Sequence, residues 1–149
     1  MTNIIPFAFR GALLSAQHNF ANGGNAFKIA LYTSSPYSTS STVYLSGASN
    51  NEVSSGSSSN YAQGGEALGS QAVASGTAVA SVDFADVSWN SATFTAAFAA
   101  IYNSTTVGGT ANRLVVVLDF GGNKTATNGT FTVSFPNPST PANAIISMA

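Results

Sequence analysis

The side chains with which this chain could perform acid, base or metal chemistry are few. The 149 residues include four basic residues, five acidic residues, one histidine and no cysteine. They are Arg10, Lys28, Arg113, Lys124, Glu52, Glu66, Asp83, Asp86, Asp119 and His18. Zinc and iron–sulfur sites draw largely on cysteine and histidine ligands. This chain has no cysteine and a single histidine. We therefore predict that the chain binds no metal and no cofactor.

Asp83 and Asp86 are the two carboxylates nearest to each other in the sequence. A calcium site usually needs several oxygen ligands, and a glycosidase needs two carboxylates on opposite sides of a cleft. Such a cleft would require the fold to bring Glu52 or Glu66 towards the pair. Because aspartate commonly binds nearby backbone in turns, we interpret Asp86 as the cap of a turn and predict no catalytic carboxylate.

His18 is the remaining candidate for a general base. A serine-based triad also needs an orienting acid and a nucleophile on a strained turn, and the sequence contains no G-x-S-x-G pattern. We interpret His18 as a polar residue at the end of a helix. Arg113 and Asp119 bound the most apolar segment and could pair with Lys124 or with a neighbouring subunit. The chain is thus predicted not to be an enzyme.

Low charge is the strongest feature of the composition. Charged residues make up 6% of the chain and the formal net charge is -1, against roughly 25% charged residues in typical soluble proteins. Four scattered cations cannot neutralise many phosphates, so nucleic acid is not an expected partner. A weakly charged surface repels copies or partners little, which favours association. Neither a membrane span nor a secretory signal is expected, because the apolar runs are short and no basic region precedes Ile4.

One short helix is predicted near the N-terminus, over residues 5–18. Pro6 suits the first helical turn, and Phe9, Leu13 and Ala16 recur on one face at helical spacing. Gly11 weakens this helix by about 1 kcal/mol relative to alanine.

Alternating apolar and polar residues, separated by turn signals, indicate strands along the rest of the chain. The predicted strands cover residues 27–33, 66–74, 78–84, 93–103, 113–120, 130–135 and 144–148. The run at 114–118 is apolar throughout, which is typical of a central strand buried on both faces. Gly121-Gly122 is expected to end that strand, and Asn128-Gly129 is a hairpin-type signal. The pattern predicts a mainly β fold, either a β-sandwich or a small barrel, with one short N-terminal helix.

The length suits a single domain over residues 1–149, with an arm and helix at 1–25 and a β domain at 26–149. Within the β domain, residues 34–59 form a long Ser-rich loop, and loops of that length are often functional or ordered by a partner. Several aromatic residues lie near loops or strand ends, namely Tyr32, Tyr37, Tyr44, Tyr61 and Trp89. They could stack on carbohydrate, form a protein interface or be partly buried, and the sequence leaves these alternatives open.

The order and spacing of several short motifs resemble those of a group of small tailed-bacteriophage structural proteins. The motifs are FKIALYTS at 27–34, NEV at 51–53 followed by Gly64-Gly65, VDFADVSW at 82–89, IYNS at 101–104, VLDFGG at 117–122, TFTV at 130–133 and AII at 144–146. The resemblance spans most of the chain and includes a helix ahead of the first strand. The departure is at 53–64, where a serine-rich stretch stands in place of a compact turn.

The resemblance implies a virion component, and we expect a capsid decoration (cement) protein on the capsid surface, made in the host cytoplasm. Proteins of this kind bind the major capsid protein, commonly as homotrimers at local symmetry axes, and stabilise the shell through non-covalent contacts. The alternative is a tail, collar or fibre-associated component that binds a host glycan. A hydrolase that acts on the cell envelope is the least favoured of these three functions.

Contact with the shell or with an adjacent subunit is expected at residues 2–9. This stretch is more apolar than a free terminus requires, although it could equally dock onto the sheet of its own chain. The predicted interface residues are Ile4, Ile5, Phe7, Phe9, Tyr37 and Tyr44.

Overall fold

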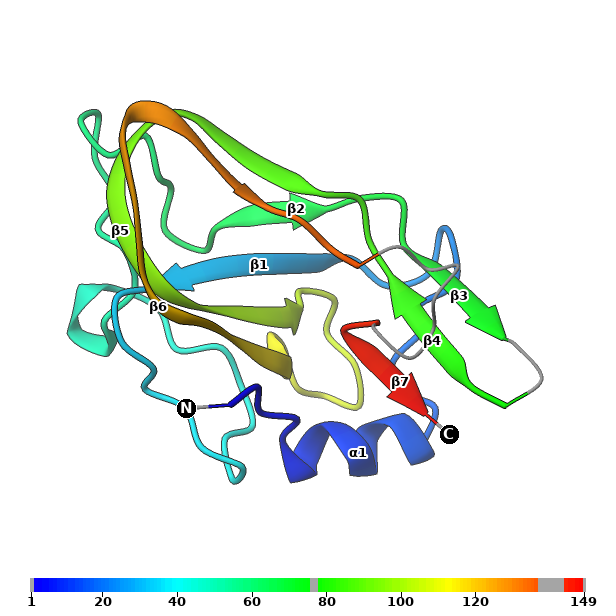
Figure 1. The fold of residues 1–149 in the computed structure, drawn as a ribbon. Coiled ribbons are helices and arrows are strands. Elements are labelled where there is room, and N and C mark those ends of the chain that lie inside the picture. Colours follow the sequence, from blue (N-terminus) through cyan, green and yellow to red (C-terminus); the bar gives the residue numbers. More distant parts are fainter. Residues whose placement is uncertain (1, 76–77, 137–143, 149) are drawn as a thin grey trace.

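The computed structural model describes residues 2–75, 78–136 and 144–148, and it confirms a mainly β fold with one short N-terminal helix (Figure 1). The elements are α1 (Phe7–Leu14), β1 (Phe27–Tyr32), a 3-10 helix (Ala48–Asn50), β2 (Glu66–Leu68), β3 (Ala72–Ser75), β4 (Ala80–Asp83), β5 (Val87–Asn103), β6 (Arg113–Val133) and β7 (Ile146–Met148).

The strands form two antiparallel sheets. Strands β2, β1, β5 and β6 make a four-stranded sheet in that order, and β3, β4 and β7 make a three-stranded sheet. Each sheet has two edges within the described ranges, so neither closes on itself and the small-barrel alternative is wrong. Helix α1 lies beside β7 at the bottom of the view in Figure 1.

Strands β5 and β6 form a long ribbon that bends back over the rest of the sheet (Figure 1). The bend coincides with a bulge, because Phe98 pairs with Asp119 and Ala96 pairs with Lys124. One residue of β5 therefore stands opposite four residues of β6. Those four include Gly121 and Gly122, at φ +72° and +132°, which glycine adopts readily. The prediction that this glycine pair ends the strand is wrong, because it bends the strand instead.

Asn128 and Gly129 are also inside β6, where Gly129 pairs with Ala92 of β5. Asn128 has φ +47° and lies next to a second register shift. The predicted hairpin signal therefore marks a bulge. A bulge and a hairpin turn both need a residue with positive φ, so the local sequence is the same for either.

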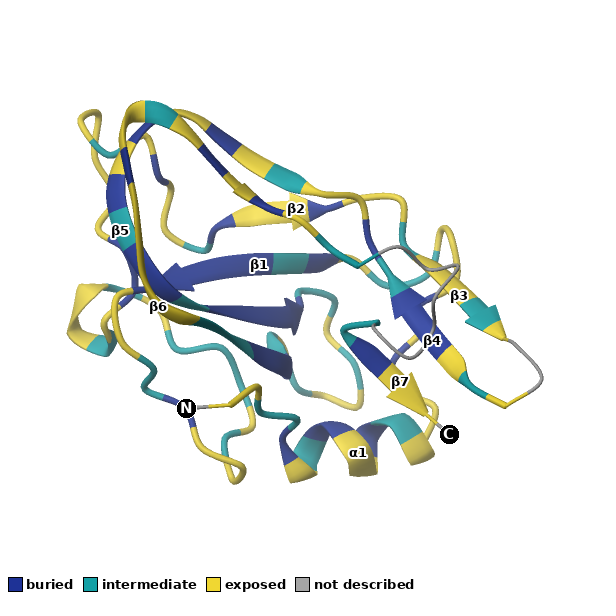
Figure 2. Cartoon of the chain, viewed as in Figure 1, coloured by how far each residue is buried: buried dark blue, intermediate teal, exposed yellow. Residues whose placement is uncertain are grey.

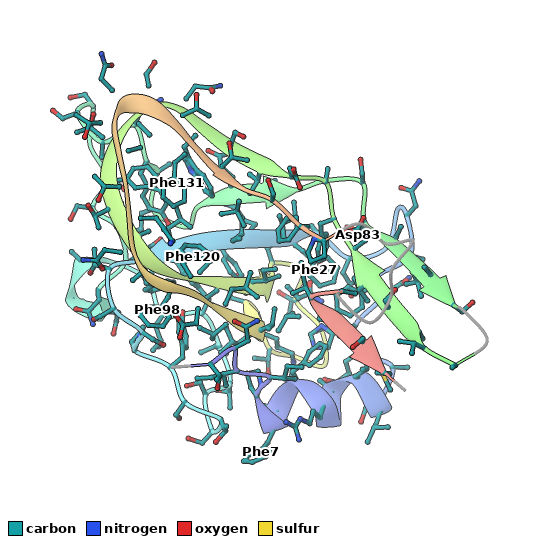
Figure 3. The ribbon with its side chains drawn as sticks, in the orientation of Figure 1. Phe7, Phe27, Asp83, Phe98, Phe120 and Phe131 are labelled. Atoms are coloured by element: carbon teal, nitrogen blue, oxygen red, sulfur yellow. The ribbon has the colours of Figure 1, made fainter. Side chains whose placement is uncertain are left out.

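Strand β1 lies at the centre of the core because both of its faces are covered. Phe27, Ile29 and Leu31 belong to a large cluster that also takes side chains from α1, β4, β7 and the far end of the ribbon. Ala30 and Tyr32 belong to a second cluster, on the opposite face of the four-stranded sheet. Figure 2 shows β1 buried along most of its length, and Figure 3 places Phe27 and Phe131 inside the molecule.

Four of the five residues in the apolar run of β6 are buried as predicted, with Leu114 and Val117 each 1% exposed, and Leu118 is partly buried. The predicted position of this run is wrong, because β6 is an edge strand of its sheet. Two isolated bridges cover that edge. Ile4 exchanges two backbone hydrogen bonds of 2.8 Å with Val117, and the Leu114 amide donates to the Thr42 carbonyl at 3.0 Å. The N-terminal arm and the Ser-rich loop therefore satisfy backbone groups that an edge strand would otherwise leave open.

Helix α1 is shorter than the predicted 5–18. It ends at Leu14 because Ala16 takes a left-handed conformation at φ +53°. The Gln17 amide donates to the Ala12 carbonyl at 2.9 Å, and the Ala16 amide donates to the Leu13 carbonyl at 3.1 Å. This pair of hydrogen bonds is a Schellman motif, which satisfies carbonyls at the helix end. Ala16 is therefore exposed and leaves the predicted apolar face.

The fold corrects one further prediction. The single strand predicted at 66–74 is two strands, β2 and β3, which belong to different sheets. Trp89 lies near the start of β5. The Ser-rich loop at 34–59 contains a 3-10 helix and isolated bridges but, in this described stretch, no strand.

Candidate functional site

The most elaborate polar cluster surrounds Glu52, which is 2% exposed. Oε1 of Glu52 accepts hydrogen bonds from the Tyr61 hydroxyl at 2.9 Å and the Gly64 amide at 2.7 Å. Oε2 accepts from the Tyr44 hydroxyl at 2.8 Å and the Gly47 amide at 2.6 Å. A carboxylate has about four acceptor positions, so these four donors occupy its acceptor capacity.

The electrostatics of the cluster keep its phenols protonated. Burial, together with the nearby Glu52 carboxylate, raises the pKa of Tyr44 and of Tyr61. The same two causes raise the pKa of Tyr102 to about 12. A protonated phenol can donate to the carboxylate, whereas an ionised one could not. The Glu52 cluster is therefore a structural clasp that joins segments of the long loop.

The Ser-rich loop is ordered by its own chain. The Tyr32 hydroxyl lies 2.6 Å from the Tyr37 hydroxyl and donates to the Leu45 carbonyl at 2.7 Å. The Leu45 amide donates to the Tyr37 hydroxyl at 3.0 Å. Tyr44 stacks on Tyr102, with ring centroids 4.3 Å apart. Together with the Glu52 clasp, these contacts hold the loop against the sheet.

Of the alternatives that the sequence left open for the aromatic residues, the structure shows burial. Tyr32, Tyr37, Tyr61 and Trp89 are all 4% exposed or less, and Tyr44 is half-buried. Their rings fill the two apolar clusters. No flat aromatic platform for a sugar is formed by these residues.

His18 is buried between the rings of Phe9 and Phe20, at centroid distances of 5.1 and 6.0 Å. Its Nδ1 lies 3.0 Å from Nδ2 of Asn103, so the amide donates and Nδ1 accepts. Burial, and then the charge of Arg113, lower the pKa of His18 to about 4. The imidazole is therefore neutral at pH 7, and its hydrogen bond holds it in the fold.

The remaining candidate residues are separate from one another. Asp86 Oδ1 accepts from the Phe135 amide at 2.8 Å, so the prediction that Asp86 caps a local turn is wrong. Asp119 Oδ1 accepts from the Gly121 amide at 2.9 Å, which lowers the pKa of Asp119. Asp83 is on β4 and Glu66 on β2, in different sheets.

Neither a metal cluster nor a membrane helix is found in the part of the chain that the structure describes. No three His, Asp or Glu side chains there are grouped so that they could hold a metal ion. No described helix is long and apolar enough to cross a membrane.

An apolar groove lies between α1 and the three-stranded sheet. It consists of two adjoining cavities of about 280 and 300 Å³, which share Leu13, Ile146 and Met148. The smaller cavity is also lined by Arg10 and Leu14. The larger cavity is also lined by Phe20, Val73 and Val82. We call these two cavities the α1–β7 groove.

The rim of the α1–β7 groove carries unusually exposed apolar side chains. Within the described ranges, the exposed large apolar residues are Phe7, Leu14, Val73 and Met148, at 61%, 86%, 55% and 55%. Three of them line the groove, and Phe7 is on the same helix as Leu14. Figure 2 shows the exposed side of α1 and the exposed end of β7, and Figure 3 shows Phe7 pointing away from the body of the molecule.

The predicted interface residues divide between two places. Ile5 and Phe9 line the α1–β7 groove, and Phe7 is exposed beside it. Ile4 pairs with Val117. Phe9 is 2% exposed, so a partner can reach little of it. Tyr37 and Tyr44 belong to the second cluster, across the four-stranded sheet from the groove.

The sequence reasoning missed Leu14, Val73 and Met148. A signal for Leu14 was present, because Phe7, Arg10 and Leu14 follow one another at helical spacings of three and four, on a stripe separate from the buried Phe9. Val73 and Met148 gave no comparable signal, since their exposure depends on the pairing of short strands.

Comparison with protein-family models, with curated proteins and with solved structures gives no match for this chain. The surfaces and clusters described above therefore provide the basis for a functional proposal, together with the resemblance in its motifs.

Proposed function

We propose that this chain is a non-enzymatic structural subunit of a bacteriophage virion, a capsid decoration (cement) protein that binds the outside of the head shell. The observation that carries the proposal is the α1–β7 groove with its exposed apolar rim. Exposed apolar surface that gathers in one place is typical of interaction sites, whereas scattered exposed residues are not. The order of the sequence motifs supports the assignment to a virion.

The ionisable groups that the fold buries support a structural role. Glu52 accepts four internal hydrogen bonds, and His18 is neutral and bonded to Asn103. A catalytic base must be able to reach the proton that it abstracts, and these two groups are turned into the fold. Both side chains organise the protein itself.

The mechanism in this proposal is adhesion. Apolar surface that a partner covers contributes about 25 cal/mol per Å². The weak net charge of −1 adds little repulsion between neighbouring subunits. We propose that such contacts hold the major capsid protein and that the subunits act as homotrimers, so that each joins adjacent parts of the shell.

Copy number tests this function. Purified particles of the phage that encodes the chain should contain hundreds of copies, counted by quantitative mass spectrometry against the major capsid protein. Particles stripped of the protein should lose their genome at a lower temperature. A few copies confined to the tail would overturn the proposal and would favour the alternative of a tail or fibre component.

A further inference from the structure

We propose that the α1–β7 groove binds a short apolar segment of a different protein, and that this segment carries a carboxylate opposite Arg10. The inference rests on the proposed function and names the chemistry of the partner. It assigns the binding site to residues on α1, β3 and β7.

The apolar character of the site comes from the groove and its rim. The walls are formed by the shared residues Leu13, Ile146 and Met148, and the rim by Leu14 and Val73. Leu14 is 86% exposed, which leaves most of a leucine side chain to be covered by a partner. Covering such a side chain with apolar side chains of a partner removes apolar surface from water and favours binding. A segment with two or three apolar side chains is the chemical match for this surface.

The acidic character of the partner follows from Arg10. Among the described residues that line the groove, Arg10 is the one that carries a charge at neutral pH. Its guanidinium lies 5.3 Å from the centroid of the exposed Phe7 ring and donates one long hydrogen bond, of 3.4 Å, to the Ile5 carbonyl. A guanidinium has five donors in a planar fork that fits a carboxylate. The remaining donors are available to a carboxylate of the partner.

A second copy of this chain fits the groove poorly. The exposed large apolar residues of the described ranges surround this one groove, so another copy offers matching apolar surface only through its own groove. Groove-to-groove contact would bring two Arg10 guanidinium groups into one interface without an acidic partner, which is costly. An anionic membrane is also a poor match, since membrane-binding surfaces carry clusters of basic residues and Arg10 is the one basic residue among the described residues that line this groove.

Two synthetic peptides test the proposal on the full chain. Both have ten residues of alternating leucine, valine and serine, and they differ at one central position, which is aspartate in the first and lysine in the second. Methyl NMR should show that the aspartate peptide shifts the Leu14 and Met148 signals and binds about tenfold more tightly than the lysine peptide, because an exposed charge pair is replaced by repulsion.

Charge reversal in the protein supplies the sharper comparison. Arg10→Glu should reverse the order of the two peptides, and Leu14→Ser combined with Met148→Ser should abolish binding of both. Lys124→Glu is the matched control, because it makes the same charge change at an exposed position of β6 outside the groove and should leave the aspartate peptide bound. Circular dichroism and thermal unfolding would check that each variant folds.

The inference is overturned if the peptides bind equally, if neither binds, or if Arg10→Glu changes neither affinity. It is also overturned if sedimentation shows self-association that Leu14→Ser removes, or if vesicles containing phosphatidylglycerol shift the same signals while the aspartate peptide does not. The proposed function is tested separately, by the copy number in particles. If particles carry hundreds of copies and the Leu14→Ser, Met148→Ser variant decorates shells as well as the unchanged chain, that result removes this inference alone.

Discussion

At the scale of single residues, Glu52 and His18 show how the fold uses two ionisable side chains as structural parts. Glu52 joins the segments around Tyr44 and Tyr61, and His18 joins the end of the helical arm to Asn103 of β5. Hydrogen bonds to a buried carboxylate contribute about 1.5–3 kcal/mol each when they are charge-assisted. Removing either group should therefore weaken the fold rather than an activity.

Replacing Glu52 by glutamine should lower the free energy of unfolding by about 2–4 kcal/mol. The glutamine side chain has the same size, but its NH₂ group donates hydrogen bonds where a carboxylate oxygen accepted them. Buried backbone amide or tyrosine hydroxyl donors of the cluster therefore lose their acceptor. Urea unfolding measures the loss, and limited proteolysis should cut the Ser-rich loop at 34–59 faster. The matched control is Glu66→Gln on β2, which is exposed and should change stability by less than about 0.5 kcal/mol. Equal stability of the two variants would contradict the clasp.

His18 should make stability depend on pH in a defined window. Its pKa is about 4 in the folded chain and 6.5 in the unfolded chain, so between these values the unfolded chain binds more protons. The free energy of unfolding should therefore be unaffected by His18 above pH 6.5 and should fall as the pH drops towards 4. The total loss is up to about 3 kcal/mol.

Urea unfolding at a series of pH values, in the chain and in His18→Gln, measures this effect. Glutamine can still accept from Asn103 but does not titrate in this range. The difference between the two profiles isolates the histidine from the carboxylates, which are common to both. Parallel profiles between pH 4 and 6.5 would show that His18 is not buried as a neutral imidazole.

At the scale of elements, positive-φ positions decide where segments end or bend. Ala16 ends α1 at φ +53°, and Gly121 and Gly122 bend β6 without ending it. The strands themselves followed the alternation in the sequence, because one apolar face of each strand packs on the core. The bend in β6 did not follow from the alternation. A glycine pair can serve either in a turn between two strands or in a bulge within one strand.

Ala16→Gly should raise the free energy of unfolding by about 0.5–1 kcal/mol, because glycine adopts the left-handed conformation without the steric cost of a Cβ atom. Thermal unfolding measures the gain. The paired substitution Ala8→Gly, inside α1, should lower stability by up to about 1 kcal/mol. If both substitutions destabilise the chain by the same amount, the helix does not end at Leu14 in the Schellman motif.

At the scale of the whole molecule, the two faces of the four-stranded sheet are covered by different parts of the chain. One face packs against α1, the three-stranded sheet and the folded-back ribbon, and the α1–β7 groove opens beside that layer. The other face holds the second cluster, which includes Tyr32 and Tyr102 and takes Tyr37 and Tyr44 from the long loop. The interface predicted at residues 2–9 lies partly on the first side, and Tyr37 and Tyr44 lie on the second. Among the described residues, neither Glu52 nor any of its four hydrogen-bond donors lines the groove.

The sequence by itself determined the mainly β class, the N-terminal helix, most of the strands and the low charge, because these depend on local periodicity and on composition. Only the tertiary structure decided where Glu52 lies, since its four donors come from residues 44, 47, 61 and 64, which sequence order alone does not bring together. The position of the α1–β7 groove also depends on the tertiary structure. Leu14 and Met148 are 134 residues apart, and β7 reaches the side of α1 through its pairing with β4. Contacts between distant segments depend on how the chain packs, and a local pattern does not specify that packing.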